Sequence, residues 1–328
     1  MAVGTPTCDV LVVGGGLGGV SAALAAADAG ATVVLTEESD WIGGQVTTQA
    51  VPLDGHRYIE WTGSSASYRT LNQAVRDHYR RYYPLTAAAA GRLYLNPGAG
   101  YVGPNCHEPR VALAVLHALL APHIHAGRVH LRLRTRAVVE TSGDVITVVH
   151  LRDAEGLERE VKAAYVLDAT ELGDLLPMAC AEYVTGAESQ AEYDEPHAPT
   201  VADPLNMQAI TWCFALDHIE GADFTIERPR DYDFWRVYQP PFWPNRLLDF
   251  TYPFPQDLRP LTTTIVPNPD DDPVAIDAIP ADRTGTEDLW LYRRILARRN
   301  FVSGAFESDI TLANWPQHDY WEGPIIEV

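Results

Sequence analysis

One stretch near the N-terminus, residues 8–37, constrains the fold more than any other part of the chain. It opens with an apolar run that is typical of a buried parallel strand. The glycine-rich turn Gly14-x-Gly16-x-x-Gly19 follows, and then a run of small residues predicts a helix. A second, β-branched run ends at Glu37. The order of strand, turn, helix, strand and acid predicts a Rossmann-like βαβ unit that binds a dinucleotide.

Each residue of this unit has a physical task. Gly14 allows the tight turn, Gly16 lets the backbone approach a diphosphate, and Gly19 lets the helix lie close to the sheet. The free N–H groups at the helix start hold the diphosphate, and the acid at the end of the second strand accepts hydrogen bonds from the adenosine ribose. The alternative is an ordinary glycine-rich turn. The predicted nucleotide contacts in this unit are Gly14, Gly16, Leu17, Gly18, Gly19, Glu37 and Glu38.

The chain composition excludes some partners. Its 328 residues are 46% hydrophobic, which is enough for one large domain or two ordinary ones. The formal net charge of −20 makes nucleic acid and anionic membranes poor partners. No basic residues precede the first apolar run, which argues against a signal peptide or membrane span. The four dispersed cysteines lack metal-binding spacing, so we expect a cytoplasmic protein with reduced thiols and no metal site.

A glycine pair follows the ribose acid in the sequence W-I-G-G-Q, residues 41–45. This segment resembles a turn of FAD-dependent oxidoreductases in which the glycine pair approaches the flavin diphosphate and ribityl chain. NAD-binding domains usually lack such a pair. The resemblance therefore implies FAD as the bound nucleotide, with Gly43, Gly44 and Gln45 among its contacts.

A β-rich block occupies residues 129–170. The pattern predicts a strand over 129–140, a hairpin over 145–163, and a strand over 165–170 that returns to the parallel sheet. The segment L-D-A-T-E-L-G-D resembles the turn of two-dinucleotide-binding flavoproteins that lies against FAD, which implies contacts from Ala169 and Thr170. Glu171 stands where that family has glycine. By the same resemblance, the backbone of Val138 contacts the adenine.

A loop rich in glycine and proline, residues 96–109, carries Cys106, His107 and Glu108 between two predicted helices. One interpretation is an active-site loop beside the flavin, in which His107 and Glu108 act as acid–base groups. The other reading is a turn that caps the next helix, with Pro109 as its first residue. Both readings stay open at this stage.

Residues 181–328 are predicted to form an α+β substrate domain. Strands are expected over 181–186 and 209–216, and an amphipathic helix over 290–300. The segment N-W-P-Q-H-D-Y-W, residues 314–321, frames His318 and Asp319 with aromatic rings. These two residues are further candidates for acid–base work, although a structural hydrogen-bonding role is equally compatible with the pattern.

Together these segments resemble a largely uncharacterised bacterial group of FAD-dependent oxidoreductases. The resemblance implies an α/β fold with a Rossmann-like FAD-binding domain over residues 1–180, a β-meander crossover, an insertion over 45–108, and the substrate domain. It implies hydride transfer between a small organic substrate and FAD. The alternative is an FAD-binding subunit or a tRNA-modification-type flavoprotein with a recognition role. The acidic charge argues against tRNA.

In flavoproteins of this type the chain returns to the FAD domain through a Gly-Asp turn and a glycine-rich helix start. Residues 175–328 contain no Gly-Asp pair and no such helix start. We therefore expect a second polypeptide, either a separate subunit or the other part of a cleaved precursor, to complete the FAD domain. After residue 37 the Gly-x-Gly-x-x-Gly spacing recurs only at residues 98–103, inside a loop rich in glycine and proline, so we expect a nicotinamide cofactor to bind only transiently.

Overall fold

The computed structural model describes residues 7–54, 56, 58–254, 257–269, 288–320 and 322–325. The chain divides into two compact units. Unit 1 comprises Met1–Gln49 and Pro109–Val184, and unit 2 comprises Ala50–Glu108 and Thr185–Val328. From residue 50 onwards, the segment predicted as an insertion therefore belongs to the same unit as the C-terminal part of the chain.

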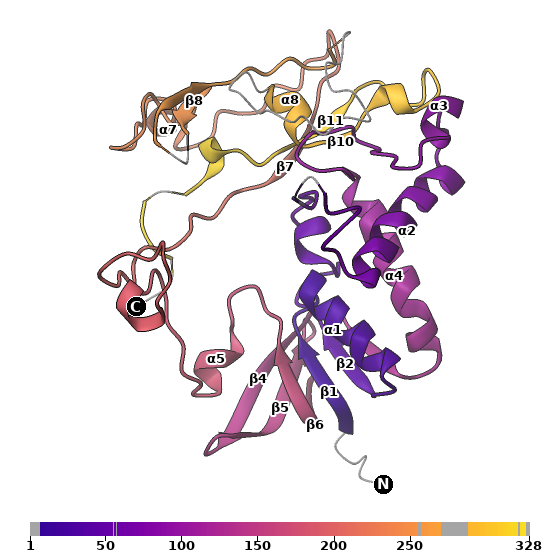
Figure 1. Cartoon of the computed structure of the whole chain (residues 1–328), viewed down its shortest axis with the longest axis vertical. Helices are drawn as coiled ribbons and strands as arrows, with labels where there is room; N and C mark the ends of the chain where they lie inside the picture. The colour runs from indigo at the N-terminus through magenta and orange to yellow at the C-terminus, as the bar shows by residue number, and fades with distance from the viewer. Residues whose placement is uncertain are drawn as a thin grey trace. The chain divides into compact units, whose positions relative to one another are not determined.

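Unit 1 is built on a six-stranded sheet with the order β3-β2-β1-β6-β5-β4 (Figure 1). β1 pairs in parallel with β2 and β6, and β2 pairs in parallel with β3. β4, β5 and β6 form an antiparallel meander. The predicted Rossmann-like α/β fold with a β-meander crossover is therefore confirmed. The strands are β1 (Thr7–Val13), β2 (Val33–Thr36), β3 (Val129–Arg132), β4 (Thr135–Ser142), β5 (Val145–Asp153) and β6 (Glu158–Asp168).

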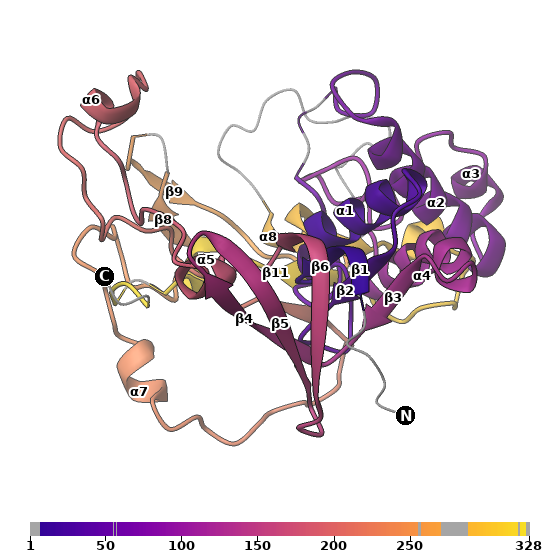
Figure 2. The same ribbon diagram turned by 90° about the horizontal axis from the view of Figure 1, so that it is seen from below.

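β6 belongs to both parts of this sheet (Figure 2). Residues 158–161 pair with β5, whereas residues 162–168 pair with β1. The prediction of two separate strands, over 157–163 and 165–170, is wrong at this point. The sequence from Glu158 to Asp168 contains no glycine or proline, so one uninterrupted strand extends from the meander into the parallel part.

The prediction of a single strand over residues 129–140 is also wrong. β3 ends at Arg132 and β4 begins at Thr135. Between them Arg134 has a φ of 50°, a left-handed conformation in which a strand cannot continue. This break lets β3 stay in the parallel part of the sheet while β4 starts the meander.

Helices α1 (Leu17–Asp28) and α4 (Pro109–His125) pack against each other, and they contact the parallel strands. They bury small or branched residues, namely Gly19, Val20, Ala23 and Ala27 of α1 and Val111, Ala112, Val115, Leu116 and Leu120 of α4. A separate apolar cluster joins β1 to the meander and to the short helix α5 (Leu175–Met178). The short 3₁₀ helix η1 (Gly44–Val46) completes the unit.

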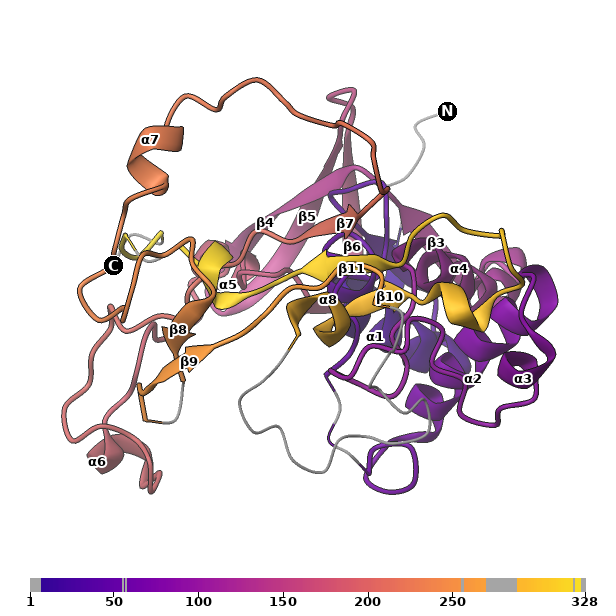
Figure 3. The same cartoon turned by 90° about the horizontal axis from the view of Figure 1, so that it is seen from above.

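Unit 2 has long connections between short elements. Its helices are α2 (Ala66–Tyr82), α3 (Ala87–Ala90), α6 (Gln190–Tyr193), α7 (Tyr232–Trp235), α8 (Leu289–Tyr292), η2 (Arg298–Asn300) and η3 (Pro316–His318). Its strands are β7 (Phe214–Asp217), β8 (Thr251–Pro253), β9 (Pro260–Thr262), β10 (Arg294–Leu296) and β11 (Ile310–Ala313). β10, β11 and β7 lie side by side in one sheet, and β8 pairs with β9 (Figure 3). Trp321, the last residue of the predicted aromatic segment, lies outside the described residues.

Several element predictions between residues 181 and 300 are wrong. Residues 181–186 form no strand, and of residues 209–216 only the end belongs to β7. The predicted amphipathic helix over 290–300 is instead the short helix α8 followed by β10 and η2. An exposed helix would leave its arginines in solvent, but Arg294 is 1% exposed and forms an ion pair with Asp309. Tertiary pairing overrides the helical pattern here.

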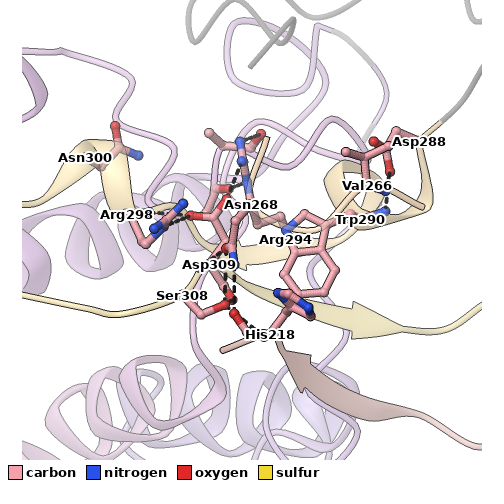
Figure 4. A network of polar contacts seen from close by, with 12 residues as sticks. His218, Val266, Asn268, Asp288, Trp290, Arg294, Arg298, Asn300, Ser308 and Asp309 are labelled. Carbon is pink, nitrogen blue, oxygen red and sulfur yellow. Dashed lines mark hydrogen bonds and ion pairs between the residues drawn. The ribbon is translucent and has the colours of Figure 1, made fainter. Parts of the chain in front are cut away.

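A buried polar network holds this part of unit 2 together (Figure 4). The Arg294 guanidinium donates hydrogen bonds to the carbonyl oxygens of Gly98 (2.8 Å) and Ala99 (3.2 Å). It also donates to one carboxylate oxygen of Asp309 at 2.9 Å. The other carboxylate oxygen accepts a bond from the backbone N–H of Arg298 at 2.7 Å. These side chains thus form hydrogen bonds with backbone groups that are not paired within a helix or a strand.

Candidate functional site

The glycine-rich turn joins β1 to α1 and brings backbone groups into direct contact. Gly14 has a φ of 98°, and a Cβ at this position would lie 2.2 Å from the carbonyl oxygen of Ala169. A Cβ on Gly19 would lie 1.9 Å from the carbonyl oxygen of Gly14. Gly16 is the N-cap of α1 and supplies no side-chain hydrogen bond. The first N–H groups of α1 are therefore left for an external acceptor such as a phosphate.

The predicted glycine pair packs directly on this turn. The Gly43 N–H donates to the Gly15 carbonyl oxygen at 2.8 Å, and Gly16 and Gly43 form an isolated parallel bridge. A Cβ on Gly44 would lie 3.2 Å from the Cα of Gly16. Gln45 follows on η1 with an exposed side chain. The two turns make one backbone surface, residues 14–19 and 43–44, which we call the glycine cradle.

The turn after β6 lies against the same surface. The Ala169 N–H donates to the Val13 carbonyl oxygen at 2.7 Å. The Asp168 carboxylate accepts bonds from the Thr170 N–H (3.0 Å), the Thr170 hydroxyl (2.7 Å) and the Leu175 N–H (2.9 Å). The structure therefore brings the predicted contacts Ala169 and Thr170 to the glycine cradle.

Glu37 anchors the cradle from the end of β2. Its Oε2 accepts a hydrogen bond from the Gly15 N–H at 2.9 Å, and its Oε1 accepts one from the Ser39 N–H at 2.8 Å. A carboxylate oxygen has two lone pairs, so each can accept a further bond from a ribose hydroxyl. The geometry is compatible with the predicted role of Glu37 and adds a structural one.

Glu38 lines a neighbouring groove in unit 1, and Val138 lies on β4, the strand that carries Arg136 of the same groove. The groove has a volume of about 630 Å³ and is lined by Glu38, Ser39, Asp40, Arg134, Arg136, Arg152, Asp153, Ala154 and Gly156. Glu38 forms an ion pair with Arg136 at 3.2 Å. Val138 lies two residues further along β4, with 52% of its surface exposed. Of these two predicted contacts, Glu38 therefore lines the groove, and Val138 is exposed on β4 outside its lining.

The cradle fits the diphosphate of a dinucleotide. Methyl groups on Gly14, Gly19 or Gly44 would collide with neighbouring atoms, so only glycine leaves this backbone open. The positive end of the α1 dipole favours an anion at the same place. FAD carries such a diphosphate, and the ribose acid Glu37 is bonded to the cradle itself.

His107 and Glu108 lie in unit 2, in the loop before α4. The His107 ring is buried, and its Nδ1 donates to the Asn105 carbonyl oxygen at 2.7 Å. Burial lowers the pKa of His107. The Tyr79 hydroxyl donates to Glu108 Oε2 at 3.0 Å and accepts from the Glu108 N–H at 2.9 Å. Burial also raises the pKa of Tyr79 well above its usual value, with the Glu108 charge as the next cause.

His318 and Asp319 have a different set of partners in unit 2. The His318 ring stacks on Trp315 at a centroid distance of 5.3 Å, and Phe214 lies 5.1 Å away. Its Nδ1 is buried and has no hydrogen-bond partner among the described residues. The Asp319 carboxylate accepts a bond from the Thr211 hydroxyl. Burial lowers the pKa of His318 and raises that of Asp319.

Some residues at these sites were not predicted from the sequence. They are Tyr79, which binds Glu108, Thr211 and Trp315, which contact Asp319 and His318, and Glu171, whose carboxylate lies at the cradle. Glu171 gave a signal, because it replaces the glycine of the resembled turn, and Trp315 belongs to the aromatic segment that frames His318. Tyr79 and Thr211 depend on contacts between segments far apart in the sequence. Among the described residues, no three His, Cys, Asp or Glu side chains gather as a metal site requires.

Comparison with known protein families matches residues 9–328 to the family described as FAD dependent oxidoreductase. The match spans more than half of the chain. The chain belongs to this family. The predictions that this chain is an FAD-dependent oxidoreductase and that its cofactor is FAD are therefore confirmed. A comparison with curated protein sequences found no match.

Solved structures also resemble this FAD-dependent oxidoreductase. The myxobacterial chondrochloren halogenase, an FAD-dependent halogenase, is 18% identical, with 50% of this chain and 37% of that chain covered and a TM-score of 0.31. L-proline dehydrogenase from P. horikoshii is 18% identical, with coverages of 50% and 22% and a TM-score of 0.27. The 3-ketosteroid-Δ4-(5α)-dehydrogenase from Rhodococcus jostii is 16% identical, with coverages of 51% and 47% and a TM-score of 0.28. This chain thus spans less than half the length of each, and the family match identifies it.

Within the described part of this FAD-dependent oxidoreductase, no helix is both long enough and apolar enough to cross a bilayer.

Proposed function

We propose that this chain binds FAD through the glycine cradle and uses it to transfer a hydride to or from a small organic substrate. FAD supplies the hydride chemistry when it is bound, and the protein supplies binding, orientation and proton handling. The observation that carries the proposal is the direct packing of the Gly43–Gly44 turn on the Gly14–Gly19 turn. We expect the protein to act in the cytoplasm, because its four cysteines are unpaired.

FAD retention tests the cradle. A Gly16→Val variant places a branched side chain where the two turns meet, so the purified protein should be colourless and bind added FAD at least a hundredfold more weakly, a loss of roughly 3 kcal/mol. An Ala25→Val variant adds a branched side chain on the exposed side of the same helix and is the matched control. Full FAD occupancy in Gly16→Val would show that the diphosphate lies elsewhere.

His318 is the strongest of the four candidate acid–base residues. Its Nδ1 is buried without a partner among the described residues, and its ring is oriented by Trp315 and Phe214. His107, in contrast, already donates its Nδ1 proton to a carbonyl oxygen, and Glu108 already shares the Tyr79 hydroxyl. We assign proton transfer to His318 with Asp319 beside it, and a structural role to His107 and Glu108.

Rapid mixing of flavin-loaded protein with alcohols, amines and carbonyl compounds in the absence of oxygen tests this assignment. A His318→Asn variant should keep its FAD and lose most of the pH dependence of flavin reduction. A His107→Gln variant should keep that pH profile. If His107→Gln rather than His318→Asn alters the profile, the assignment is reversed. Failure of the whole panel to reduce bound flavin would favour a binding role over turnover.

We further propose that a second polypeptide segment covers β6. Residues 162–168 pair with β1 on one side, and the ladders of the described residues give them no strand on the other side. Tyr165 is 70% exposed and Leu167 39% exposed, although they lie in a strand with the apolar sequence of a buried one. An open apolar edge of this kind recruits another strand or packing partner.

Native mass spectrometry and light scattering test the proposed partner. The native protein should have a mass above the 36.1 kDa of this chain. A Tyr165→Lys/Leu167→Lys variant should lower the mass to that of the single chain, whereas the same change at the exposed Tyr232 should not. A stable, flavin-loaded monomer of the unmodified chain would overturn the proposal.

A further inference from the structure

The turn that carries Glu171 is tightly fixed on both sides of that residue. Asp168 holds the start of the turn through the Thr170 N–H and hydroxyl, and its other oxygen holds the Leu175 N–H. The Thr170 hydroxyl oxygen in turn accepts a bond from the Asp174 N–H at 2.7 Å. The backbone on both sides of Glu171 is therefore held in place, and the turn fixes where its side chain starts.

The Glu171 carboxylate lies on the glycine cradle. Its Oε1 lies 3.0 Å from the position of a Cβ on Gly16 and 2.8 Å from that of a Cβ on Gly44. These two glycines are the ones through which the two turns of the cradle meet. The first turn of α1 contains no acidic residue of its own. Glu171 thus brings a carboxylate from another segment to the positive end of the helix.

A carboxylate and a diphosphate compete for this place. Both are anions that accept hydrogen bonds, and both are favoured by the N–H groups at a helix start. Two like charges a few ångströms apart also repel each other. FAD therefore cannot place its diphosphate in the cradle while Glu171 keeps this conformation, and the side chain has to turn towards solvent.

We propose that Glu171 sets the affinity of this chain for FAD by occupying the diphosphate position until the cofactor displaces it. The inference rests on the proposed placement of the diphosphate in the cradle. Its consequence is an exchangeable cofactor: FAD binds more weakly than the glycine surface alone would permit. The chemical group that competes with Glu171 is the diphosphate. Any nucleoside diphosphate that binds in the cradle should therefore bind more weakly because of Glu171.

Equilibrium binding of FAD, ADP and adenosine to the FAD-free full chain tests the proposal without requiring turnover. A Glu171→Gln variant keeps the shape of the side chain and removes its charge. It should bind FAD and ADP roughly five- to tenfold more tightly than the unmodified chain. Its affinity for adenosine, which has no diphosphate, should not change. The gain should shrink as salt is added, because ions screen exposed charges.

An Asp174→Asn variant is the matched control. Asp174 is an exposed acid in the same turn, and its side chain does not cap α5. Removing its charge should alter ADP affinity less than twofold if the effect of Glu171 is local. If both variants gained the same affinity for ADP, the cause would be the lower net negative charge of the chain and not the position of Glu171. That result would overturn the proposal. Weaker FAD binding by Glu171→Gln would also overturn it, since Glu171 would then be a ligand of the cofactor.

The Gly16→Val variant separates this inference from the proposed function. If it abolishes ADP binding while Glu171→Gln leaves ADP binding unchanged, the cradle holds the diphosphate and only the role of Glu171 is wrong. If Gly16→Val binds ADP normally, the diphosphate is placed elsewhere and both proposals fail. Thermal unfolding of each variant shows whether the fold is retained.

Discussion

The glycine cradle of unit 1 and the loop at residues 96–108 of unit 2 are both irregular, yet they are stabilised in opposite ways. In the cradle, glycines let backbone groups bond to one another directly, as in the 2.8 Å bond between Gly43 and Gly15. In the loop, buried arginines supply the hydrogen bonds. Arg294 donates to two loop carbonyls, and Arg76 donates to those of Leu95 and Pro104.

This difference explains what each region can do. A surface built mainly from glycine backbone can accept a ligand that forms hydrogen bonds with N–H groups, because its glycines carry no side chains and Glu171 reaches it only from the turn after β6. A loop that buried guanidinium groups hold through its carbonyl oxygens keeps its side chains in fixed positions. The first arrangement suits cofactor binding, and the second suits a rigid frame for the substrate unit.

The largest expected effect comes from matched glycine substitutions in the two regions. A Cβ on Gly19 would lie 1.9 Å from a backbone oxygen of unit 1, and a Cβ on Gly98 would lie 2.2 Å from the Arg294 carbonyl oxygen of unit 2. Gly19→Val should abolish FAD retention and cost at least about 4 kcal/mol of stability. Gly98→Val should be equally destabilising but should spare FAD binding in whatever folded protein remains. FAD loss in both variants would break the comparison.

The next largest effect concerns the ion pair of the network in Figure 4. An Arg294→Met variant removes the buried cation that bonds to the Asp309 carboxylate, which is 5% exposed, and leaves it only the partly exposed Arg298 at 3.5 Å. The free energy of unfolding should fall by about 3–5 kcal/mol. Adding Asp309→Leu should recover part of that loss, because the buried carboxylate that has lost its closer cation is gone. Urea denaturation followed by tryptophan fluorescence measures both. An unchanged midpoint in Arg294→Met would show that the pair contributes no stability.

A smaller effect is expected at the Tyr79 hydroxyl, which bonds to both the side chain and the backbone of Glu108. A Tyr79→Phe variant should lose about 1–3 kcal/mol, because the Glu108 N–H is left without its acceptor. Tyr82→Phe on the exposed side of α2 should be neutral. Chemical denaturation checks both variants. If Tyr79→Phe is as stable as the parent, water replaces the hydroxyl and the loop is less rigid than described.

The smallest effect is a pH dependence from His107. Burial lowers the pKa of His107 below its ordinary value of 6.5. Between the folded pKa and pH 6.5, His107 is therefore protonated in the unfolded chain and neutral in the folded chain. This contribution to stability is present above pH 6.5 and is lost as the pH falls from 6.5 towards the folded pKa. A His107→Gln variant should lose stability less steeply below that pH than the parent. An exposed His130→Gln variant should follow the parent curve.

Local backbone chemistry decides the structure of the glycine cradle, so this part of the fold can be predicted from the sequence. Gly14, Gly16, Gly19 and the acid at Glu37 each have a conformational or hydrogen-bonding reason that follows from their spacing. The structure also brings the Gly43–Gly44 pair to the same surface. These features depend on contacts within one βαβ unit and its following turn, and such contacts leave a readable pattern.

Contacts between distant segments decide the structure elsewhere, and those parts could not be predicted from the sequence. Residues 290–300 have a helical pattern, but β10 forms there because β11 supplies a partner strand and Asp309 supplies a counter-ion for Arg294. The break at Arg134 depends on a single left-handed residue that carries no glycine signal. Thr211 and Phe214, which contact Asp319 and His318, lie more than a hundred positions earlier in the sequence. A single sequence does not reveal such pairings.

The long strand β6 has a consequence for how the protein forms during synthesis. The first residues of β1 pair with it, Thr7 with Lys162, so β1 acquires this neighbour only after the whole meander has left the ribosome. Until then, one edge of β1 has no strand beside it, and an unpaired apolar edge invites mispairing between nascent chains. β1 and β6 therefore pair late in synthesis. Many ribosomes on one messenger RNA, or slow elongation before residue 162, should lower the yield of correctly folded protein.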